Sequence, residues 1–214
     1  MSLAVKEYFN GAADDFDAIY SGSGPIWRWV NRHFRRDMYE RYRLTFEASG
    51  DITNKTVLDI GCGGGRYSIE FAKRGAAQVV GLDFAPNMLE MATRHAKEQG
   101  VDSSCEFAIG DFMQIKFDQR FDVCVAMGVL DYIVDPLPFI ERRKSVAGEQ
   151  LIISFPSKSL IRTPIRKLRY KFKRCPVYFY DRPTIEGLMK NVGEYEIIKI
   201  PGQGMDYFVS AKVS

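Results

Sequence analysis

The sequence predicts one α/β domain in which a mostly parallel sheet carries helices on both of its faces. From residue 57 onward, apolar runs of strand length alternate with amphipathic segments of helix length, the pattern of parallel strands joined by crossover helices. A glycine cluster, Gly61–Gly65, follows the first run, and the first three runs end at or near Asp59, Asp83 and Asp111. Because the carboxyl ends of parallel strands line the ligand crevice of such folds, the three aspartates predict one shared site.

Length and composition agree with a single domain. The chain has 214 residues, 46% of them hydrophobic, which is enough to fill one sizeable core. We expect four consecutive parts: a helical cap over residues 1–50, a cofactor-binding core over 51–155, a basic insertion over 156–182, and a C-terminal helix and hairpin over 183–214.

No apolar run approaches the roughly 20 residues of a membrane span, and residues 1–10 lack the apolar block of a signal peptide. We therefore expect a cytoplasmic protein. The net charge of +3 is too small to indicate a class of partner by itself. The cysteines form no C-x-x-C pair, which favours buried thiols over disulfides or a zinc site, so that no metal is expected: Cys62, Cys105, Cys124 and Cys175.

The N-terminal part predicts helices that precede the sheet. Residues 4–20 have apolar positions close to helical spacing, interrupted by Gly11, and predict two short helical pieces. Pro25 stands where a helix can begin, and residues 26–48 predict a long, basic and aromatic-rich helix. Its aromatic side chains either pack on the sheet or reach the ligand site, and packing is the commoner role at such spacing.

Residues 57–68 predict a buried strand, a tight turn and the start of a helix over Tyr67–Arg74. Glycines let the backbone approach a ligand, and a helix N-terminus adds free N–H groups with a partial positive charge. A dinucleotide fingerprint would have its third glycine where Arg66 stands, and Asp59 would repel a pyrophosphate. The same carboxylate suits a ligand with an ammonium group. A purely structural turn after a core strand is the alternative.

The second strand is predicted over Gln78–Asp83. Asp83 lies a little over 20 residues beyond the first glycine, where nucleotide-binding α/β folds place an acid that accepts both ribose hydroxyls. Phe84 is placed either against a purine ring or in ordinary packing. Pro86 then starts a helix that runs to Gln99, with Met88 facing inward.

Further strands are expected over Cys105–Ile109, Phe121–Ala126 and Gln150–Phe155, with a helix from Asp135-Pro136 to Arg143. The fourth strand would lie beside the first, at the point where the strand order reverses. The residues that follow it, Met127 to Ile133, are therefore expected to border both the cofactor and the acceptor.

Between Pro156 and Pro176 the sequence has eight basic residues and no acidic one, on a segment with an apolar stripe. Three interpretations of this basic insertion are open: a solvated helix face, a membrane-surface or nucleic-acid patch, and a cap that attracts an anionic substrate. A helix over Thr184–Asn191 and strands over Tyr195–Ile200 and Tyr207–Val213 complete the chain.

The spacing D-x-G-x-G-x-G from Asp59 to Gly65 resembles motif I of the class I S-adenosylmethionine-dependent methyltransferases. The resemblance extends from Tyr8 to Val213 and implies a Rossmann-like, seven-stranded, mostly parallel sheet with an antiparallel last strand. It also implies S-adenosylmethionine as the cofactor, S-adenosylhomocysteine as the product, and adenine held by Asp111 and covered by the ring of Phe112. The residues expected at the cofactor are Asp59, Gly61, Cys62, Gly63, Arg66, Asp83, Phe84, Met88, Asp111, Phe112 and Met127.

Residues 7–10, Phe16 and residues 19–21 resemble the start of the magnesium-protoporphyrin O-methyltransferases, and the basic insertion is similar to theirs. This resemblance implies methyl esterification of a carboxylate, with Tyr20 near the reacting groups. Where those enzymes tend to have His-Tyr after the fourth strand, this chain has Asp131-Tyr132, which alters any acid–base role. A different acid or a phenol is therefore an equal alternative to the porphyrin.

The expected activity is methylation of a small acceptor, neutral or anionic, at a carboxylate or hydroxyl oxygen. No D/N-P-P-Y/F sequence, typical of enzymes that methylate the amino groups of bases or glutamine, follows the fourth strand. A carboxylate needs no general base at neutral pH, whereas a hydroxyl does, and Asp131, His33 or Tyr20 could serve, with Tyr132 beside them. The alternatives are a nucleic-acid methyltransferase, supported only by the basic insertion, and a cofactor-binding module without catalysis.

Overall fold

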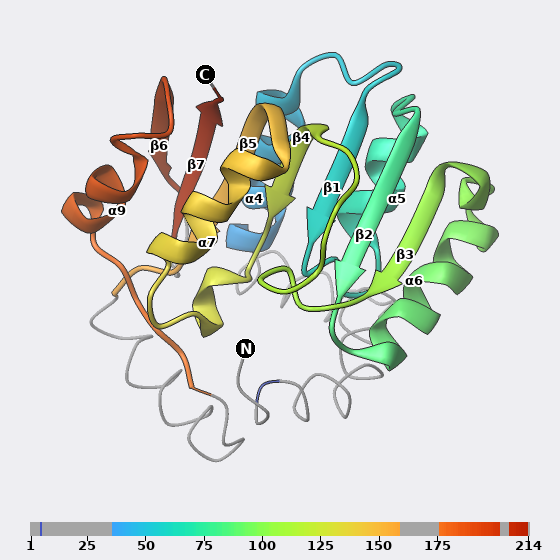
Figure 1. Ribbon diagram of the computed structural model, residues 1–214, viewed down its shortest axis with the longest axis horizontal. Coiled ribbons are helices and arrows are strands. Elements are labelled where there is room, and N and C mark those ends of the chain that lie inside the picture. Colours follow the sequence, from blue (N-terminus) through green and yellow to red (C-terminus); the bar gives the residue numbers. More distant parts are fainter. Residues whose placement is uncertain (1–4, 6–35, 159–175, 202–205, 214) are drawn as a thin grey trace.

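The computed structural model describes residue 5 and residues 36–158, 176–201 and 206–213. Within them, one sheet of seven strands has the order β3-β2-β1-β4-β5-β7-β6 (Figure 1). The strands are β1 (Thr56–Ile60), β2 (Gln78–Asp83), β3 (Cys105–Ile109), β4 (Phe121–Ala126), β5 (Ala147–Phe155), β6 (Tyr195–Lys199) and β7 (Tyr207–Lys212). Strands β1 to β5 pair in parallel, whereas β7 is antiparallel to both of its neighbours, β5 and β6. The predicted fold class, with its antiparallel last strand, is confirmed.

Helices connect most of these strands. The described α-helices are α4 (Arg36–Ser49), α5 (Arg66–Lys73), α6 (Pro86–Glu98), α7 (Leu137–Arg142) and α9 (Arg182–Met189), and three short 3-10 helices are η1 (Asp102–Ser104), η2 (Leu130–Tyr132) and η3 (Arg143–Ser145). The helix expected over residues 26–48 is described from Arg36 onward. Its first part, the two short pieces before it and most of the basic insertion lie outside the described residues.

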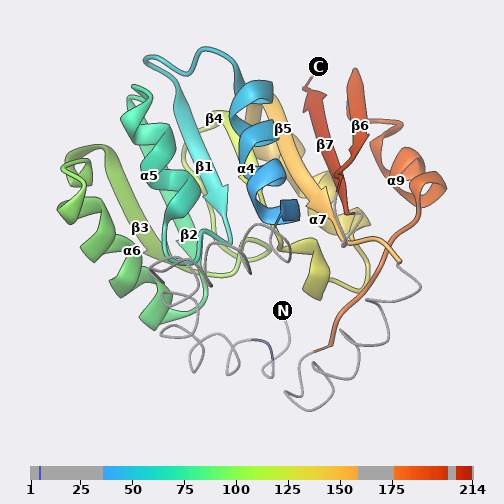
Figure 2. The ribbon, with the colours of Figure 1, turned by 180° about the vertical axis from the view of Figure 1, so that it is seen from behind.

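The sheet is buried on both faces. Val57 of β1 belongs to the hydrophobic cluster that contains Phe46 of α4 and Phe71 of α5, which cover one face (Figure 2). Its neighbour Leu58 belongs to the cluster that contains Phe139 of α7, which covers the other face (Figure 1). Because successive side chains of a strand alternate between faces, a strand covered on both sides reads as a continuous apolar run. This is why the parallel strands could be recognised in the sequence.

Two elements begin two or more residues earlier than predicted. The helix α9 starts at Arg182 because Asp181 caps it, its Oδ1 accepting from the Thr184 backbone N–H at 3.0 Å. Strand β5 starts at Ala147, three residues before the expected start, and its pairing with β4 is irregular between Phe121 and Val123. Neither difference moves the ends of the strands that carry the site.

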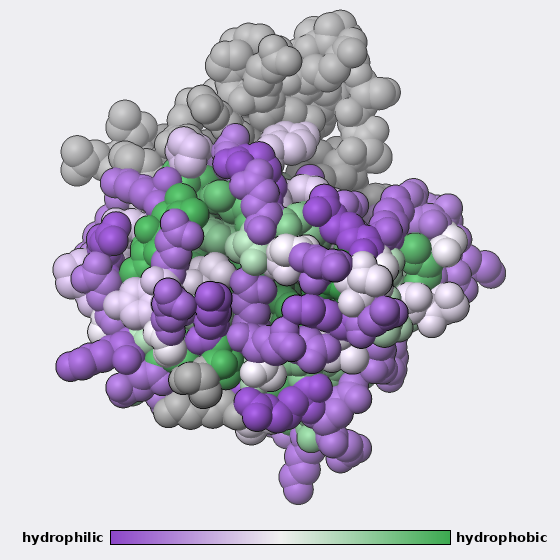
Figure 3. All heavy atoms as spheres, turned by 90° about the horizontal axis from the view of Figure 1, so that it is seen from above, coloured by the Kyte–Doolittle hydropathy of each residue, from purple (hydrophilic) through white to green (hydrophobic). Residues whose placement is uncertain are grey.

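The carboxyl ends of β1 to β4 meet along the lower edge of the sheet in Figure 1. The turns that follow these strands are therefore neighbours in space although they are far apart in the sequence. Hydrophilic side chains predominate at the opposite end of the molecule, which Figure 3 shows from above. In the part of the chain that the structure describes, no helix is both long and apolar enough to cross a membrane.

Candidate functional site

The turn after β1 is built from glycines in the left-handed region. The backbone N–H groups of Gly61 and Cys62 donate to the Leu82 carbonyl of β2 at 2.7 and 3.1 Å, which holds the turn against the end of the second strand. Gly65 has φ of 79°, and a Cβ there would lie 2.9 Å from the Cβ of Ala92 in α6. A side chain at this position would thus be both strained and in collision, so that the close packing of α6 on the turn requires glycine.

Two sides of the turn differ in their surroundings. A Cβ on Gly63 would meet no described atom within 4 Å, so the backbone is open to a ligand there. A Cβ on Gly61 would instead lie 2.5 Å from Cγ2 of Val129, in the segment after β4. The glycine turn therefore presents one open side and touches, on another, the segment expected to border the acceptor.

Asp59 is buried beneath this turn, with 1% of its surface exposed. Its Oδ2 accepts from the Ser68 hydroxyl at 2.6 Å and from the Ser68 backbone N–H at 3.1 Å, which caps the first turn of α5. Burial raises the pKa of this carboxyl to about 7, although the bonds from Ser68 act in the opposite direction. Asp59 thus has a structural partner, and its expected contact with a ligand ammonium group stays a prediction.

Asp83 connects the carboxyl end of β2 with the glycine turn. Its Oδ2 accepts from the Gly63 backbone N–H, and its Oδ1 accepts from the Ala85 backbone N–H, each at 2.9 Å. Burial raises the pKa of this carboxyl, while backbone hydrogen bonds from Ala85, Gly63 and Phe84 lower it. Asp83 thus lies at the end of β2 beside the glycine turn, and its contact with a ribose stays a prediction.

Three apolar residues expected at the cofactor have their side chains in the core. The ring of Phe112 is buried with its centroid 4.8 Å from that of Phe139, so it is not free to cover a ligand ring. Met127 is buried against α4, where its Sδ accepts from the Thr45 hydroxyl at 3.6 Å. Met88 is buried in a cluster on α6. For each, neighbouring apolar side chains hold the residue inward, as was expected for Met88, and contact of the three residues with the cofactor stays a prediction.

The other expected cofactor residues lie around the turn. Asp111 is half-buried, and its Oδ1 accepts from the Met113 backbone N–H at 3.0 Å. Phe84 is half-buried and packs against Val5, the one described residue before α4. The thiol of Cys62 is buried over Gly81 of β2, and burial raises its pKa well above the ordinary value. In the protein without a ligand, the Cys62 side chain therefore packs in the core.

Arg66 connects the glycine turn with α4. Its guanidinium carbon lies 4.3 Å from the ring centroid of Tyr42 and 5.6 Å from that of Tyr39. Burial and the adjacent Glu70 raise the pKa of Tyr42 to about 12, so its phenol stays neutral. The aromatic residues of α4 thus fix the side chain that stands at the start of α5.

The segment after β4 carries Asp131 and Tyr132 in η2. Asp131 is buried, with 6% of its surface exposed, and its backbone carbonyl accepts from the Tyr178 N–H at 2.8 Å. Tyr132 is half-buried beside Val5 and Val177. The expected roles of Asp131 and Tyr132 at the acceptor stay predictions, and Tyr20 and His33 lie outside the described residues.

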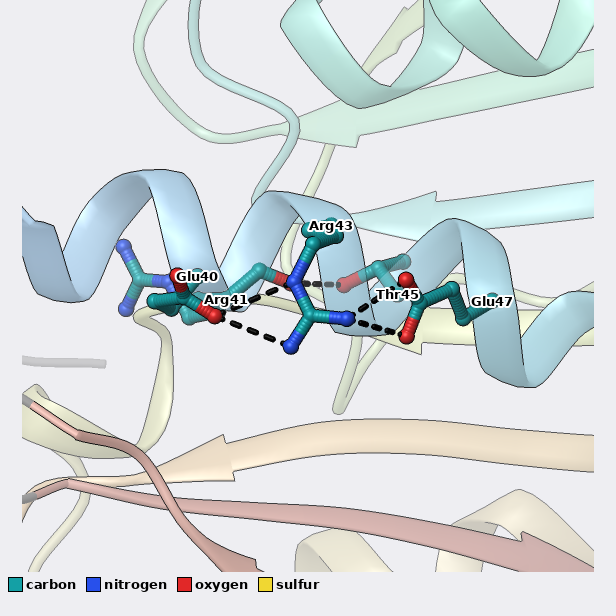
Figure 4. Close-up of polar contacts among 5 residues, drawn as sticks. All are labelled: Glu40, Arg41, Arg43, Thr45 and Glu47. Atoms are coloured by element: carbon teal, nitrogen blue, oxygen red, sulfur yellow. Dashed lines mark hydrogen bonds and ion pairs between the residues drawn. The ribbon is translucent and has the colours of Figure 1, made fainter.

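Sequence reasoning missed Arg41, a residue of α4. A Cβ built on Gly128 would lie 3.6 Å from the Arg41 Nη1 and 3.6 Å from the Asp131 Oδ2, so both charged groups converge on this glycine. In Figure 4 Arg43 lies between Glu40 and Glu47, whereas the Arg41 guanidinium lies apart from that group. In the sequence, only helical spacing could have indicated Arg41. It lies one turn before Thr45, and the Thr45 hydroxyl donates to the Arg41 carbonyl.

Cys62, Cys105 and Cys124 are free thiols. Among the described residues, no group of three or more histidine, cysteine, aspartate or glutamate side chains is arranged to hold a metal ion.

Comparison with known proteins identifies one matching family. The profile of the family described as "Methyltransferase domain" matches residues 52–176. A ubiquinone biosynthesis O-methyltransferase from Histophilus somni is 37% identical over 119 residues, which are 54% of this chain and 50% of that protein. An EEF1A lysine methyltransferase 2 from Danio rerio is 29% identical over 133 residues, covering 61% of this chain and 55% of that one. The chain thus spans about half the length of these curated relatives.

Among solved structures, the chain is similar to magnesium protoporphyrin IX methyltransferase from Synechocystis PCC 6803. The form with bound S-adenosylhomocysteine has a TM-score of 0.73 and 23% identity, and covers 98% of both chains. The form with bound S-adenosylmethionine has a TM-score of 0.75 at the same identity. At this identity the likeness establishes the fold.

Proposed function

Since the chain belongs to the methyltransferase domain family, whose profile matches more than half of it, we propose that it methylates an oxygen of a small molecule, using S-adenosylmethionine. The observation that carries this proposal is the placement of Asp83. Its carboxylate holds the glycine turn at Gly63 from the end of β2, where an acid that binds a ribose stands in nucleotide-binding α/β folds. The O-methyltransferase relative supports oxygen as the methylated atom.

The described residues fit the three parts of this cofactor. The open backbone at Gly63 and the guanidinium of Arg66 suit the methionine portion, with Asp59 below them as the partner for its ammonium group. Asp83 suits the ribose. Asp111, half-buried in the turn after β3, suits the amino group of the adenine. Phe84, rather than the buried ring of Phe112, has the exposure needed to lie against a base.

The bound cofactor supplies an electrophilic methyl group, so the work of the protein is to align the acceptor oxygen and exclude water. Val5 contributes to this exclusion, because it is fully buried between Phe84 on the cofactor side and Tyr132 on the acceptor side. Asp131 is the described group placed to accept a proton from a hydroxyl acceptor. A carboxylate acceptor would not need it.

The first experiment is calorimetric titration with S-adenosylhomocysteine, followed by transfer of labelled methyl from S-adenosylmethionine. The acceptors are magnesium protoporphyrin, aromatic carboxylic acids, phenols and bulk RNA. Binding of the cofactor product together with labelling of a small molecule is the expected result. A protein that does not bind S-adenosylhomocysteine at millimolar concentration contradicts the proposal, and labelling confined to RNA replaces the small-molecule acceptor with a nucleic acid.

A further inference from the structure

Two hydroxyl groups of buried residues hold the segment that follows β4. The backbone N–H of Gly128 donates to the Ser154 hydroxyl of β5 at 2.9 Å, and the Tyr180 hydroxyl donates to the Ile133 carbonyl. Ser154 and Tyr180 have 2% and 6% of their surfaces exposed. We call residues 128–133 the post-β4 segment. It begins at one of these hydrogen bonds and ends at the other.

Ser154 stands in an otherwise apolar part of β5. The residues around it are all buried and hydrophobic: Leu151, Ile152, Ile153 and Phe155. The regular pairing of β4 with β5 ends at Ala126 and Ile153, so the Gly128 N–H lies beyond the last pair of the two strands. A buried hydroxyl needs a hydrogen-bond partner, and the Gly128 N–H provides one. The serine therefore extends the hold of β5 past the end of β4.

Tyr180 is itself fixed to the end of β5. Its backbone N–H donates to the Pro156 carbonyl at 2.8 Å, and its ring packs edge-on against Phe155 with the centroids 5.6 Å apart. Tyr180 and Phe155 belong to the cluster on the face that α7 covers. Because side chains alternate along a strand, Ser154 points to the other face, which α4 covers. The post-β4 segment is thus held from both faces of the sheet.

The middle of the post-β4 segment touches the glycine turn. The Val129 Cγ2 lies 2.5 Å from the position of a Cβ on Gly61, so Val129 packs directly on the backbone of that turn. Strand β4, which leads into the segment, pairs with β1, which leads into the turn. The hydroxyls of Ser154 and Tyr180 therefore set where the segment lies relative to the turn expected to hold the cofactor.

We propose that Ser154 and Tyr180 are positioning residues for methyl transfer, and that the segment they hold aligns the acceptor with the methyl group of the cofactor. This inference rests on the proposed function. Transfer in line with the bond between sulfur and the methyl group tolerates little displacement, since an error of about 1 Å can lower the rate by about 100-fold. Both hydroxyls act through the backbone of the segment, so their loss affects the rate of transfer and not the affinity for the cofactor.

The chain offers variants that each remove a single oxygen, Ser154→Ala and Tyr180→Phe, and a matched control. Ser49 is also a buried serine, and its hydroxyl donates to the Phe46 carbonyl at 3.2 Å. It lies at the C-terminal end of α4, and this end of the helix lies at the edge of the sheet opposite the carboxyl ends of β1 to β4 (Figure 2). Ser49→Ala therefore loses a buried hydroxyl without a change at the post-β4 segment.

The first measurement needs no acceptor. Amide hydrogen exchange is followed at Tyr132 and Ile133, whose N–H groups donate to the Val129 and Leu130 carbonyls within the segment. In Ser154→Ala and Tyr180→Phe we expect exchange about tenfold faster than in the wild type, the factor for loss of one hydrogen bond. Ser49→Ala should exchange these amides at the wild-type rate.

The second measurement is transfer of labelled methyl from S-adenosylmethionine to magnesium protoporphyrin, benzoate and catechol. For the acceptor that is labelled, each single variant should lower kcat by about 10- to 100-fold. Affinity for S-adenosylhomocysteine, measured by calorimetry, should stay within twofold of the wild type. The double variant should lose less than the product of the two single losses, because both hydroxyls hold one segment. Ser49→Ala should have the wild-type kcat.

Exchange at Tyr132 and Ile133 that is no faster in Ser154→Ala and Tyr180→Phe than in Ser49→Ala would overturn the inference. So would a wild-type kcat in a variant with faster exchange, or an equal loss of kcat and of S-adenosylhomocysteine affinity. If no acceptor is labelled, the exchange rates alone decide. Failure of the wild type to bind S-adenosylhomocysteine would defeat the proposed function itself, so the two failures are distinguishable.

Discussion

The carboxylate of Asp83 accepts a hydrogen bond from the backbone N–H of Gly63 at 2.9 Å, which ties the end of β2 to the turn that follows β1. The two residues are neighbours only because β1 and β2 pair in parallel, with Asp59 opposite Gly81 and Ile60 opposite Leu82. Sheet register thus decides which backbone N–H the acid reaches. A change at Asp83 acts on the ligand directly and on the turn that receives it.

Replacement of Asp83 by alanine should weaken S-adenosylhomocysteine binding by about 1 to 3 kcal/mol, the range for removing one partner of buried polar groups. Isothermal titration calorimetry measures this change. Asp118→Ala is the control, because Asp118 is an exposed aspartate. Equal affinities of the two variants would remove Asp83 from the cofactor site.

Asp59 should make cofactor-product binding depend on pH. Its pKa is raised to about 7 by burial, so it is mostly protonated at pH 6 and mostly ionised at pH 8. If the ammonium group of S-adenosylhomocysteine pairs with the ionised form, affinity should rise about tenfold over this interval. Calorimetry at both pH values measures the rise, and Asp59→Asn should abolish it. A wild-type affinity as flat as that of the variant would leave Asp59 only as the cap of α5.

The same shift predicts the opposite trend for the stability of the protein without ligand. The unfolded chain ionises Asp59 near pH 4, whereas the folded chain retains the proton until about pH 7. The folded state therefore binds more protons in this window, and the free energy of unfolding should fall as pH rises from 4 to 7. Urea unfolding of wild type and Asp59→Asn at pH 5 and pH 8 isolates the contribution. A difference between the two proteins that is constant with pH would argue against the raised pKa.

Two glycine-to-alanine substitutions should have opposite effects on stability. Gly65→Ala introduces a Cβ 2.9 Å from that of Ala92 at a left-handed position, and should destabilise the protein by about 1 to 3 kcal/mol. Gly187 lies within α9 with no described atom within 4 Å of a Cβ, so Gly187→Ala should stabilise by about 0.5 to 1 kcal/mol. Chemical denaturation measures both changes, and a stable Gly65→Ala variant would mean that α6 can move away from the turn.

Strands β1, β2 and β4 could be predicted closely because both of their faces are buried, whereas β3, at the edge of the sheet, is only partly buried. Strands β2, β3 and β4 have the bounds expected from their apolar runs. The start of β5 was missed because Gly148 and Glu149 interrupt the regular pairing of the strand with β4, between the pairs Phe121–Ala147 and Val123–Gln150. The start of α9 was missed although Asp181 and Thr184 had the spacing of a helix cap.

The sequence predicts which residues lie beside the glycine turn more readily than it predicts the direction of their side chains. Asp83 stands at the end of a strand, where topology alone places it beside the glycine turn. Phe112 would follow Asp111 in the sequence whether its ring covered a ligand or packed in the core. Only its contact with Phe139 of α7 shows that the ring packs in the core. Arg41 could not be distinguished from the solvated Arg43, because which charge faces Gly128 depends on how α4 lies on the sheet.

Strand β6 has no neighbour in the sheet except β7, although it precedes β7 in the chain. During synthesis, residues 195–199 therefore leave the ribosome before β7, the strand with which they pair. Their backbone groups have no strand partner until residues 207–212 have paired with β5. The cofactor half of the sheet, β1 to β3, is already complete in the chain at residue 109. A ribosome-bound chain could thus carry a formed glycine turn while its other edge is still incomplete and open to unwanted pairing with other chains.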